Sequence, residues 1–157
     1  MCPQCEDPTL TQTDVYAAFA KTIKDEGWAI QGVTGDRLHA PFAYTVGLTD
    51  FAVPELVVTG LRHGLACALL NEVAEHSLHC EPPHPGERVR LDGGPLVEVV
   101  QLEHPDAHLF TAVALRGPDI TALQLVWADD RGRWPWERGH RGGRGGQPVL
   151  GPRCSAV

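Results

Sequence analysis

The sequence predicts an α+β fold with a mostly antiparallel, barrel-like sheet of six to seven strands and two helices. The chain has 157 residues, of which 43% are hydrophobic and 21% charged, as is typical of one globular domain. Two segments carry apolar residues at helical spacing, and seven short apolar runs are separated by glycine- and proline-rich turns. Late in the chain the connections are hairpin-sized, which favours antiparallel pairing.

The first predicted helix follows Thr13, which can cap a helix, and ends at Gly27. Its apolar residues recur at a spacing of four: Val15, Phe19 and Ile23. The second predicted helix spans residues 64–77 and has the apolar positions Leu65, Leu69, Leu70 and Val73. A proline-rich stretch then ends it.

The predicted strands follow from short runs rich in β-branched and apolar residues. They are residues 28–33, 42–46, 55–59, 88–91, 96–100, 109–115 and 121–127. Residues 55–59 follow a proline and end before a glycine, so we expect this strand to be central. From Asp129 onward glycine, proline and arginine dominate and no apolar period remains.

Charge divides the chain at the same point. Residues 1–130 hold 7 basic and 19 acidic side chains, whereas residues 131–157 hold 6 arginines and one acid. We therefore expect a globular domain over residues 1–130 and a tail rich in glycine, arginine and tryptophan over residues 131–157.

The tail predicts contact with RNA or a protein partner, because guanidinium groups pair with phosphates and indoles stack on bases. The candidate partner-binding residues are Arg131, Arg133, Trp134, Trp136, Arg141 and Arg144. An alternative of equal weight is that the tryptophans dock on the sheet while the arginines pair with the acidic body.

We expect a cytoplasmic protein without a membrane partner. The sequence has no run of about 18 apolar residues, and the first residues do not resemble a signal peptide. Its five cysteines, an odd number without regular spacing, favour free or metal-bound thiols over a disulfide framework.

The Cys2-Pro3-Gln4-Cys5 pair predicts half of a zinc site, because two thiolates on one turn suit Zn²⁺ and leave two positions for other ligands. One candidate for the second half is His104 with His108. The other is a cluster of four residues: His76, His79, Cys80 and His84. A redox role is less favoured, since a redox pair of this spacing should open a helix after a strand.

A second candidate site is a polar pocket around Tyr44, Thr49 and Glu55, at the mouth of the sheet. The alternative is structural: a bulge at Gly47, with Glu55 capping or pairing at a strand edge. Serine-hydrolase chemistry is disfavoured because no Gly-x-Ser-x-Gly motif is present. Cys67 is expected as a small core residue of the second helix.

Four segments together resemble the DUF4262 family of bacterial domains: residues 27–33, 42–49, 54–61 and 122–129. The chain is most similar to an actinobacterial branch that opens with Cys-x-x-Cys and ends with a Trp-Pro-Trp and Gly/Arg-rich segment. That branch also brings residues 104–108 into the pattern, which favours His104 and His108 as the zinc ligands.

The family has no assigned activity. The resemblance to the branch implies a zinc-responsive regulatory or adaptor domain linked to ribosome hibernation, with the ribosome or a hibernation factor as partner. The rival hypothesis is a small-molecule-binding barrel or enzyme, including a metal-dependent enzyme with an open coordination position.

Overall fold

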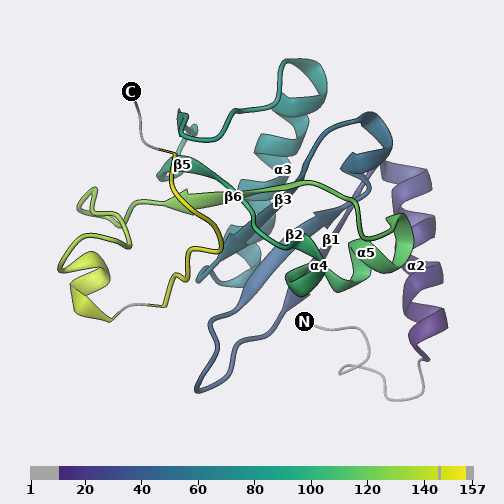
Figure 1. Cartoon of the computed structure of the whole chain (residues 1–157), viewed down its shortest axis with the longest axis horizontal. Helices are drawn as coiled ribbons and strands as arrows, with labels where there is room; N and C mark the ends of the chain where they lie inside the picture. Colours follow the sequence, from purple (N-terminus) through teal and green to yellow (C-terminus); the bar gives the residue numbers. More distant parts are fainter. Residues whose placement is uncertain (1–10, 145, 155–157) are drawn as a thin grey trace.

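The strands form one sheet in the order β1-β2-β3-β6-β5-β4, seen in the computed structural model (Figure 1), which describes residues 11–144 and 146–154. Their bounds are β1 (Ala29–Val33), β2 (Phe42–Val46), β3 (Glu55–Thr59), β4 (Arg88–Arg90), β5 (Leu96–Gln101) and β6 (Ala122–Trp127). All neighbours are antiparallel except β3 and β6, which are parallel. The α+β class and the mostly antiparallel pairing are therefore confirmed.

The expectation of a barrel-like sheet is wrong. β1 and β4 lie at opposite edges of the described sheet, which stays open. The parallel β3–β6 pair joins two antiparallel three-stranded units side by side. Their outer strands, β1 and β4, do not pair with each other.

Two long helices confirm the helix predictions: α2 (Gln12–Glu26) and α3 (His63–His79). α2 begins earlier than expected, because Thr11 forms a capping box in which it accepts from Asp14 N–H at 3.2 Å and donates its own N–H to the Asp14 carboxylate at 3.0 Å. Gly27 ends the helix with a φ of 99°.

The prediction of a strand at residues 109–115 is wrong, because this segment forms the helix α5 (Phe110–Arg116), preceded by the single turn α4 (Pro105–His108). Leu109 and Ala112 are fully buried, whereas Phe110 is 65% exposed. A short apolar run fits both an alternating and a helical pattern, so spacing alone does not distinguish them. Two short 3₁₀ turns complete the described elements: η1 (Leu48–Phe51) and η2 (His140–Gly143).

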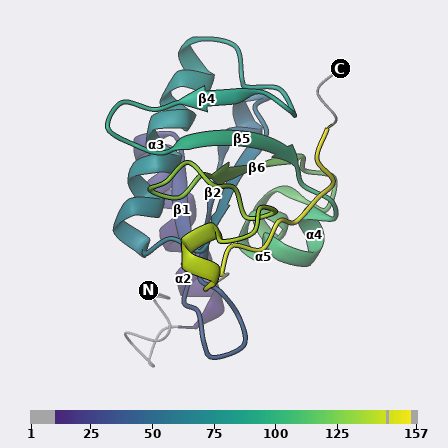
Figure 2. The same cartoon turned by 90° about the vertical axis from the view of Figure 1, so that its left-hand side faces the viewer.

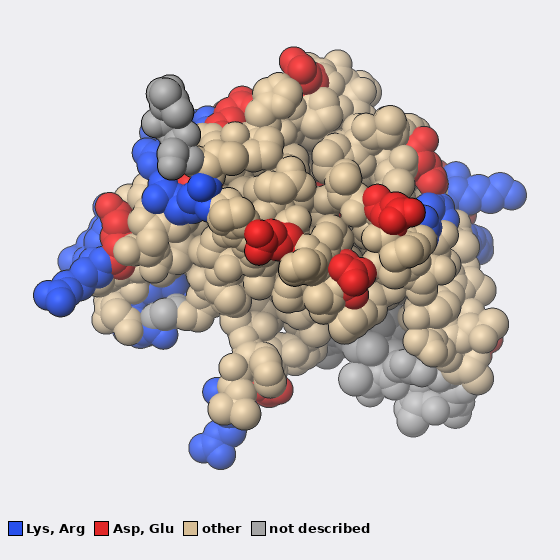
Figure 3. All heavy atoms as spheres, in the orientation of Figure 1, with Lys and Arg blue, Asp and Glu red and all other residues tan. Residues whose placement is uncertain are grey.

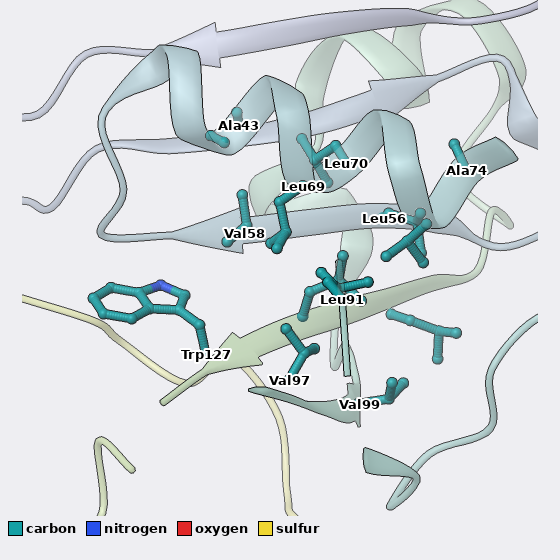
Figure 4. Close-up of a cluster of buried hydrophobic side chains, with 14 of the residues drawn as sticks. Ala43, Leu56, Val58, Leu69, Leu70, Ala74, Leu91, Val97, Val99 and Trp127 are labelled. Atoms are coloured by element: carbon teal, nitrogen blue, oxygen red, sulfur yellow. The ribbon is translucent and has the colours of Figure 1, made fainter. Parts of the chain in front are cut away.

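Helix α3 covers one face of the sheet (Figure 2), and its apolar side packs on the central strands. Figure 4 shows this cluster, in which Leu69 and Leu70 of α3 face Leu56 and Val58 of β3. It extends to Trp127 at the end of β6.

On the opposite face, α2 and α5 cover β1, β2 and β3 with a second apolar cluster that includes Phe19, Tyr44 and Leu109. β5 and most of β6 lie outside this cluster, which includes only Ala122 at the start of β6. There the cover is the C-terminal segment, defined as residues 131–144 and 146–154, which packs Trp134 against Val100 and Val126. Among the described residues, no helix has the length and apolar character needed to cross a bilayer.

Candidate functional site

The C-terminal segment is docked on the sheet by two buried glutamines. Gln124 of β6 donates to the Pro148 carbonyl at 2.8 Å and accepts from Leu150 N–H at 2.7 Å. Gln147 bonds the main chain of Trp127. The backbones approach so closely that a Cβ on Gly151 would collide with the Gln101 carbonyl oxygen. The segment expected as a tail thus lies in fixed contact with β5 and β6.

Both tail tryptophans have partners within the chain. The Trp134 and Trp136 rings stack with centroids 5.4 Å apart, and Trp134 is 5% exposed. The Arg88 guanidinium lies 4.7 Å from the Trp134 centroid, and that of Arg153 lies 3.6 Å from the Trp136 centroid. Glu98 pairs with both arginines, at 3.2 and 2.8 Å. The structure therefore places these indoles in intramolecular stacks, as in the docking alternative.

The loop around η2 has a fixed shape. Arg141, Gly142 and Gly143 are consecutive residues with positive φ, at 51°, 69° and 80°. Gly139 and Gly146, on either side of them, have φ of 85° and 88°. Because left-handed backbone is costly for residues other than glycine, the positive φ of Arg141 requires support from its surroundings.

That support comes from Asp129, two residues after the end of β6. One carboxylate oxygen accepts the N–H groups of Arg131 and Arg133 at 2.9 and 2.8 Å, and the other accepts the N–H of Arg141 at 2.8 Å. Burial alone would raise the Asp129 pKa, but these hydrogen bonds and the Arg133 guanidinium hold that pKa far below its ordinary range. Asp129 thus ties the turn after β6 and the loop around η2 to one point.

Around this carboxylate lies a hollow of about 540 Å³, which we call the arginine hollow. It is lined by Trp127, Asp129, Asp130, Arg131, Arg133, Arg141, Gly142 and Arg144. Figure 3 shows the basic side chains gathered on the side of the molecule formed by the C-terminal segment, with acidic atoms among them. The structure thus brings together four of the six predicted partner-binding residues.

Two of these arginines are held in place. Arg133 Nε lies 3.3 Å from Asp129, and its guanidinium occupies the space beside Gly139, where a Cβ would meet it at 2.8 Å. The Arg141 guanidinium lies 5.3 Å from the Trp127 ring centroid, and a Cβ on Gly146 would meet it at 3.0 Å. Arg131, Arg141 and Arg144 are exposed, whereas Arg133 is half-buried.

Of the four predicted zinc ligands, the structure describes only His104 and His108. Cys2 and Cys5 lie outside the described residues. His104 precedes α4 with a φ of 52°, and His108 is the last residue of that turn. Neither imidazole has a hydrogen bond to another described residue, and no cluster of three or more metal-ligating side chains occurs within residues 11–144 and 146–154.

The alternative histidine cluster lies at the C-terminal end of α3 and just after it. His79 pairs with Glu75 at 3.3 Å, and His84 pairs with Glu81 at 3.4 Å. Both pairs are exposed, so one ring nitrogen of each histidine is engaged by a nearby carboxylate.

The residues of the predicted polar pocket are mostly buried. Glu55 has no exposed surface and accepts from the hydroxyls of Thr45 and Thr49 and from the N–H groups of residues 47–49. Tyr44 is 2% exposed, and its hydroxyl accepts from Thr111 N–H at 3.0 Å. Burial raises the Tyr44 pKa. These polar atoms are therefore used within the fold, where they fix the turn after β2 and the start of α5.

Two groupings do not follow from the sequence pattern. One is the role of Asp129, which the Asp-Asp-Arg-Gly turn sequence signals weakly as an Asx-type loop. The other is Cys67, whose Sγ lies 3.3 Å from His63 Nε2, one helical turn away. Burial raises the Cys67 pKa, which favours the neutral thiol.

Residues 22–141 match the family described as "Domain of unknown function (DUF4262)". The match begins within α2, contains the whole sheet and ends inside the loop that borders the arginine hollow. No curated protein and no solved structure matches the chain.

Proposed function

The chain belongs to the DUF4262 family, for which no activity is described, and from its geometry we propose an adaptor domain that binds an RNA partner through the arginine hollow. The observation that carries this proposal is the convergence of Arg131, Arg133, Arg141 and Arg144 around one concavity. Guanidinium groups pair with phosphate oxygens in fixed geometry, and a concave arrangement lets several act on one strand.

The surroundings of the hollow support binding without chemistry. Asp129 is committed to three main-chain N–H groups and to Arg133, so it is not placed to act as a general base. The two tail tryptophans are engaged with Arg88 and Arg153 rather than free to stack on bases. We therefore assign the contact to phosphates. The resemblance to the hibernation-linked branch favours ribosomal RNA as the partner.

The test is binding of a mixed-sequence single-stranded RNA with a 5′ hydroxyl, followed by fluorescence anisotropy at several salt concentrations. Because each phosphate contact on a single strand contributes about 0.7 to the salt slope, Arg131→Gln/Arg144→Gln should lower the slope by about 1.4. Arg37→Gln, an exposed arginine in the β1–β2 connection, is the matched control and should leave the slope unchanged. An unchanged slope in the double variant refutes the proposal.

A second candidate function is a response to zinc, which would regulate this adaptor. It is favoured by the two imidazoles of His104 and His108, which lie four residues apart on a single turn and have no hydrogen bond to a described residue. Imidazole nitrogens together with the thiolates of Cys2 and Cys5 form a donor set that suits tetrahedral Zn²⁺.

Metal analysis of the purified protein tests the zinc proposal. We expect one equivalent of zinc in the wild type and its loss in both Cys2→Ser/Cys5→Ser and His104→Ala/His108→Ala. His76→Ala/His79→Ala is the matched control and should keep the metal. Wild-type protein without zinc, or loading that survives either ligand variant, overturns the proposal.

A further inference from the structure

We infer that the arginine hollow binds a terminal phosphate group, either a phosphate monoester or a diphosphate, rather than only the phosphodiesters within a strand. This inference rests on the proposed function and specifies the ligand of the same site. It is drawn from three features of the hollow: its formal charge, its shape and the preorganisation of its arginines.

The formal charge of the lining suits a dianion. Four arginines and the two carboxylates of Asp129 and Asp130 leave a net charge of +2. An internal phosphodiester carries one negative charge, whereas a phosphate monoester carries close to two at neutral pH. A terminal group therefore neutralises the hollow more completely than one internal phosphate does.

The shape of the hollow can admit the end of a molecule. Its volume of about 540 Å³ lies within the range of small-ligand sites. Its lining comes from two stretches of chain, residues 129–133 and 141–144, and the Asp129 carboxylate bonds the main chain of both. A terminal phosphate can enter between them, while the rest of the ligand stays outside.

Preorganisation separates the arginines into two pairs. The Arg133 guanidinium is held by the Asp129 carboxylate and that of Arg141 by the Trp127 ring, so these two lose less conformational freedom when they bind an anion. Arg131 and Arg144 are exposed lining residues that can close over a bound phosphate. The first pair thus orients the phosphate, and the second pair distinguishes a doubly charged end from a singly charged internal group.

A terminal phosphate has two sources, the 5′ end of an RNA and a free nucleotide. The experiment measures dissociation constants for four probes: a ten-nucleotide RNA with a 5′ phosphate, the same RNA with a 5′ hydroxyl, adenosine diphosphate and inorganic pyrophosphate. Each is measured with the wild type, with Arg131→Gln/Arg144→Gln, and with Arg138→Gln, an exposed arginine of the same segment that does not line the hollow.

We expect the 5′ phosphate to strengthen RNA binding by about tenfold, an advantage that Arg131→Gln/Arg144→Gln removes and Arg138→Gln keeps. Binding of adenosine diphosphate and pyrophosphate with the same arginine dependence, but of neither RNA, also supports the inference and makes a free nucleotide the source. That result would refute the RNA adaptor while leaving the terminal-phosphate site intact.

Equal affinity for the two RNAs overturns the inference, because the hollow would then bind only internal phosphates. In that case the proposed RNA adaptor still stands if both affinities fall in the Arg131→Gln/Arg144→Gln variant. A phosphate preference that survives this variant also overturns the inference, since the group would bind elsewhere. Absence of binding by all four probes refutes both proposals.

Discussion

The side-chain amide of Gln147 pairs with the main chain of Trp127 in both directions, accepting its N–H and donating to its carbonyl, each at 2.9 Å. Gln147 therefore takes the place that a neighbouring strand would have beside the last residue of β6. The amide group also lies 3.2 Å from His140 Nε2. Through these contacts the loop that shapes the arginine hollow is joined to a central strand.

Replacement of Gln147 by alanine should lower the free energy of unfolding by about 2 kcal/mol, because it leaves two buried main-chain groups of Trp127 without partners. Urea denaturation measures the change. Gln12→Ala, at the exposed start of α2, is the control and should stay within about 0.5 kcal/mol of the wild type. Equal effects of the two changes would show that Gln147 does not anchor the segment.

Glu55→Gln should destabilise the fold by about 3 kcal/mol, although it preserves the size of the side chain. Each carboxylate oxygen of Glu55 accepts at least two hydrogen bonds, so either orientation of a glutamine amide directs its NH₂ group at donors. Thermal and urea denaturation provide the measurement. Glu103→Gln, at an exposed position, serves as control, and a Glu55→Gln protein as stable as that control contradicts the structural role of Glu55.

Low pH should reduce the contribution of Asp129 to the stability of the fold. Because the Asp129 pKa is lower in the folded chain than its ordinary value of 3.8, its contribution to stability is complete above about pH 5 and is lost as the pH falls through the folded pKa. The wild type should therefore be more stable than Asp129→Asn at neutral pH, and the difference should shrink below about pH 4. Urea denaturation across this range measures it, and a difference that does not change with pH contradicts the prediction.

Two glycines in open surroundings should respond to alanine in opposite directions. Gly142 has a φ of 69° and open space where an alanine Cβ would lie, so Gly142→Ala should cost about 1 kcal/mol through backbone strain alone. Gly64 lies in the first turn of α3 with equally open space, so Gly64→Ala should stabilise by about 0.5 kcal/mol. Urea denaturation of both variants measures the two effects. A stabilising Gly142→Ala would show that the loop does not hold its left-handed turn in solution.

The strands that the sequence predicts best are those bounded by a proline and a glycine. Residues 42–46 and 55–59 form β2 and β3 with the predicted bounds, since each follows a proline and precedes a glycine. The run 109–115 has no such constraint on its conformation, and tertiary packing of Leu109 and Ala112 makes it helical. The parallel β3–β6 pair cannot be predicted from local pattern, because three helices and two strands lie between its strands in the chain.

In the candidate site, too, the sequence predicts some features, while others depend on the tertiary structure. Composition alone indicates the arginines of the C-terminal segment. Their arrangement depends on Asp129, on the positive φ angles around η2 and on Gln147, none of which follows from charge or spacing. The carboxylate of Glu55 stands out in the sequence, yet only the geometry of the turn after β2 shows that the fold itself occupies it.

The family match ends at residue 141, whereas the cover of β5 and β6 continues through Gln147, Leu150 and Arg153. A protein truncated at the family boundary would therefore keep every strand and still lose part of its cover over Val100 and Val126. Such a bare apolar strand surface favours self-association and aggregation. The residues that protect this sheet from water thus extend beyond the C-terminal end of the family match.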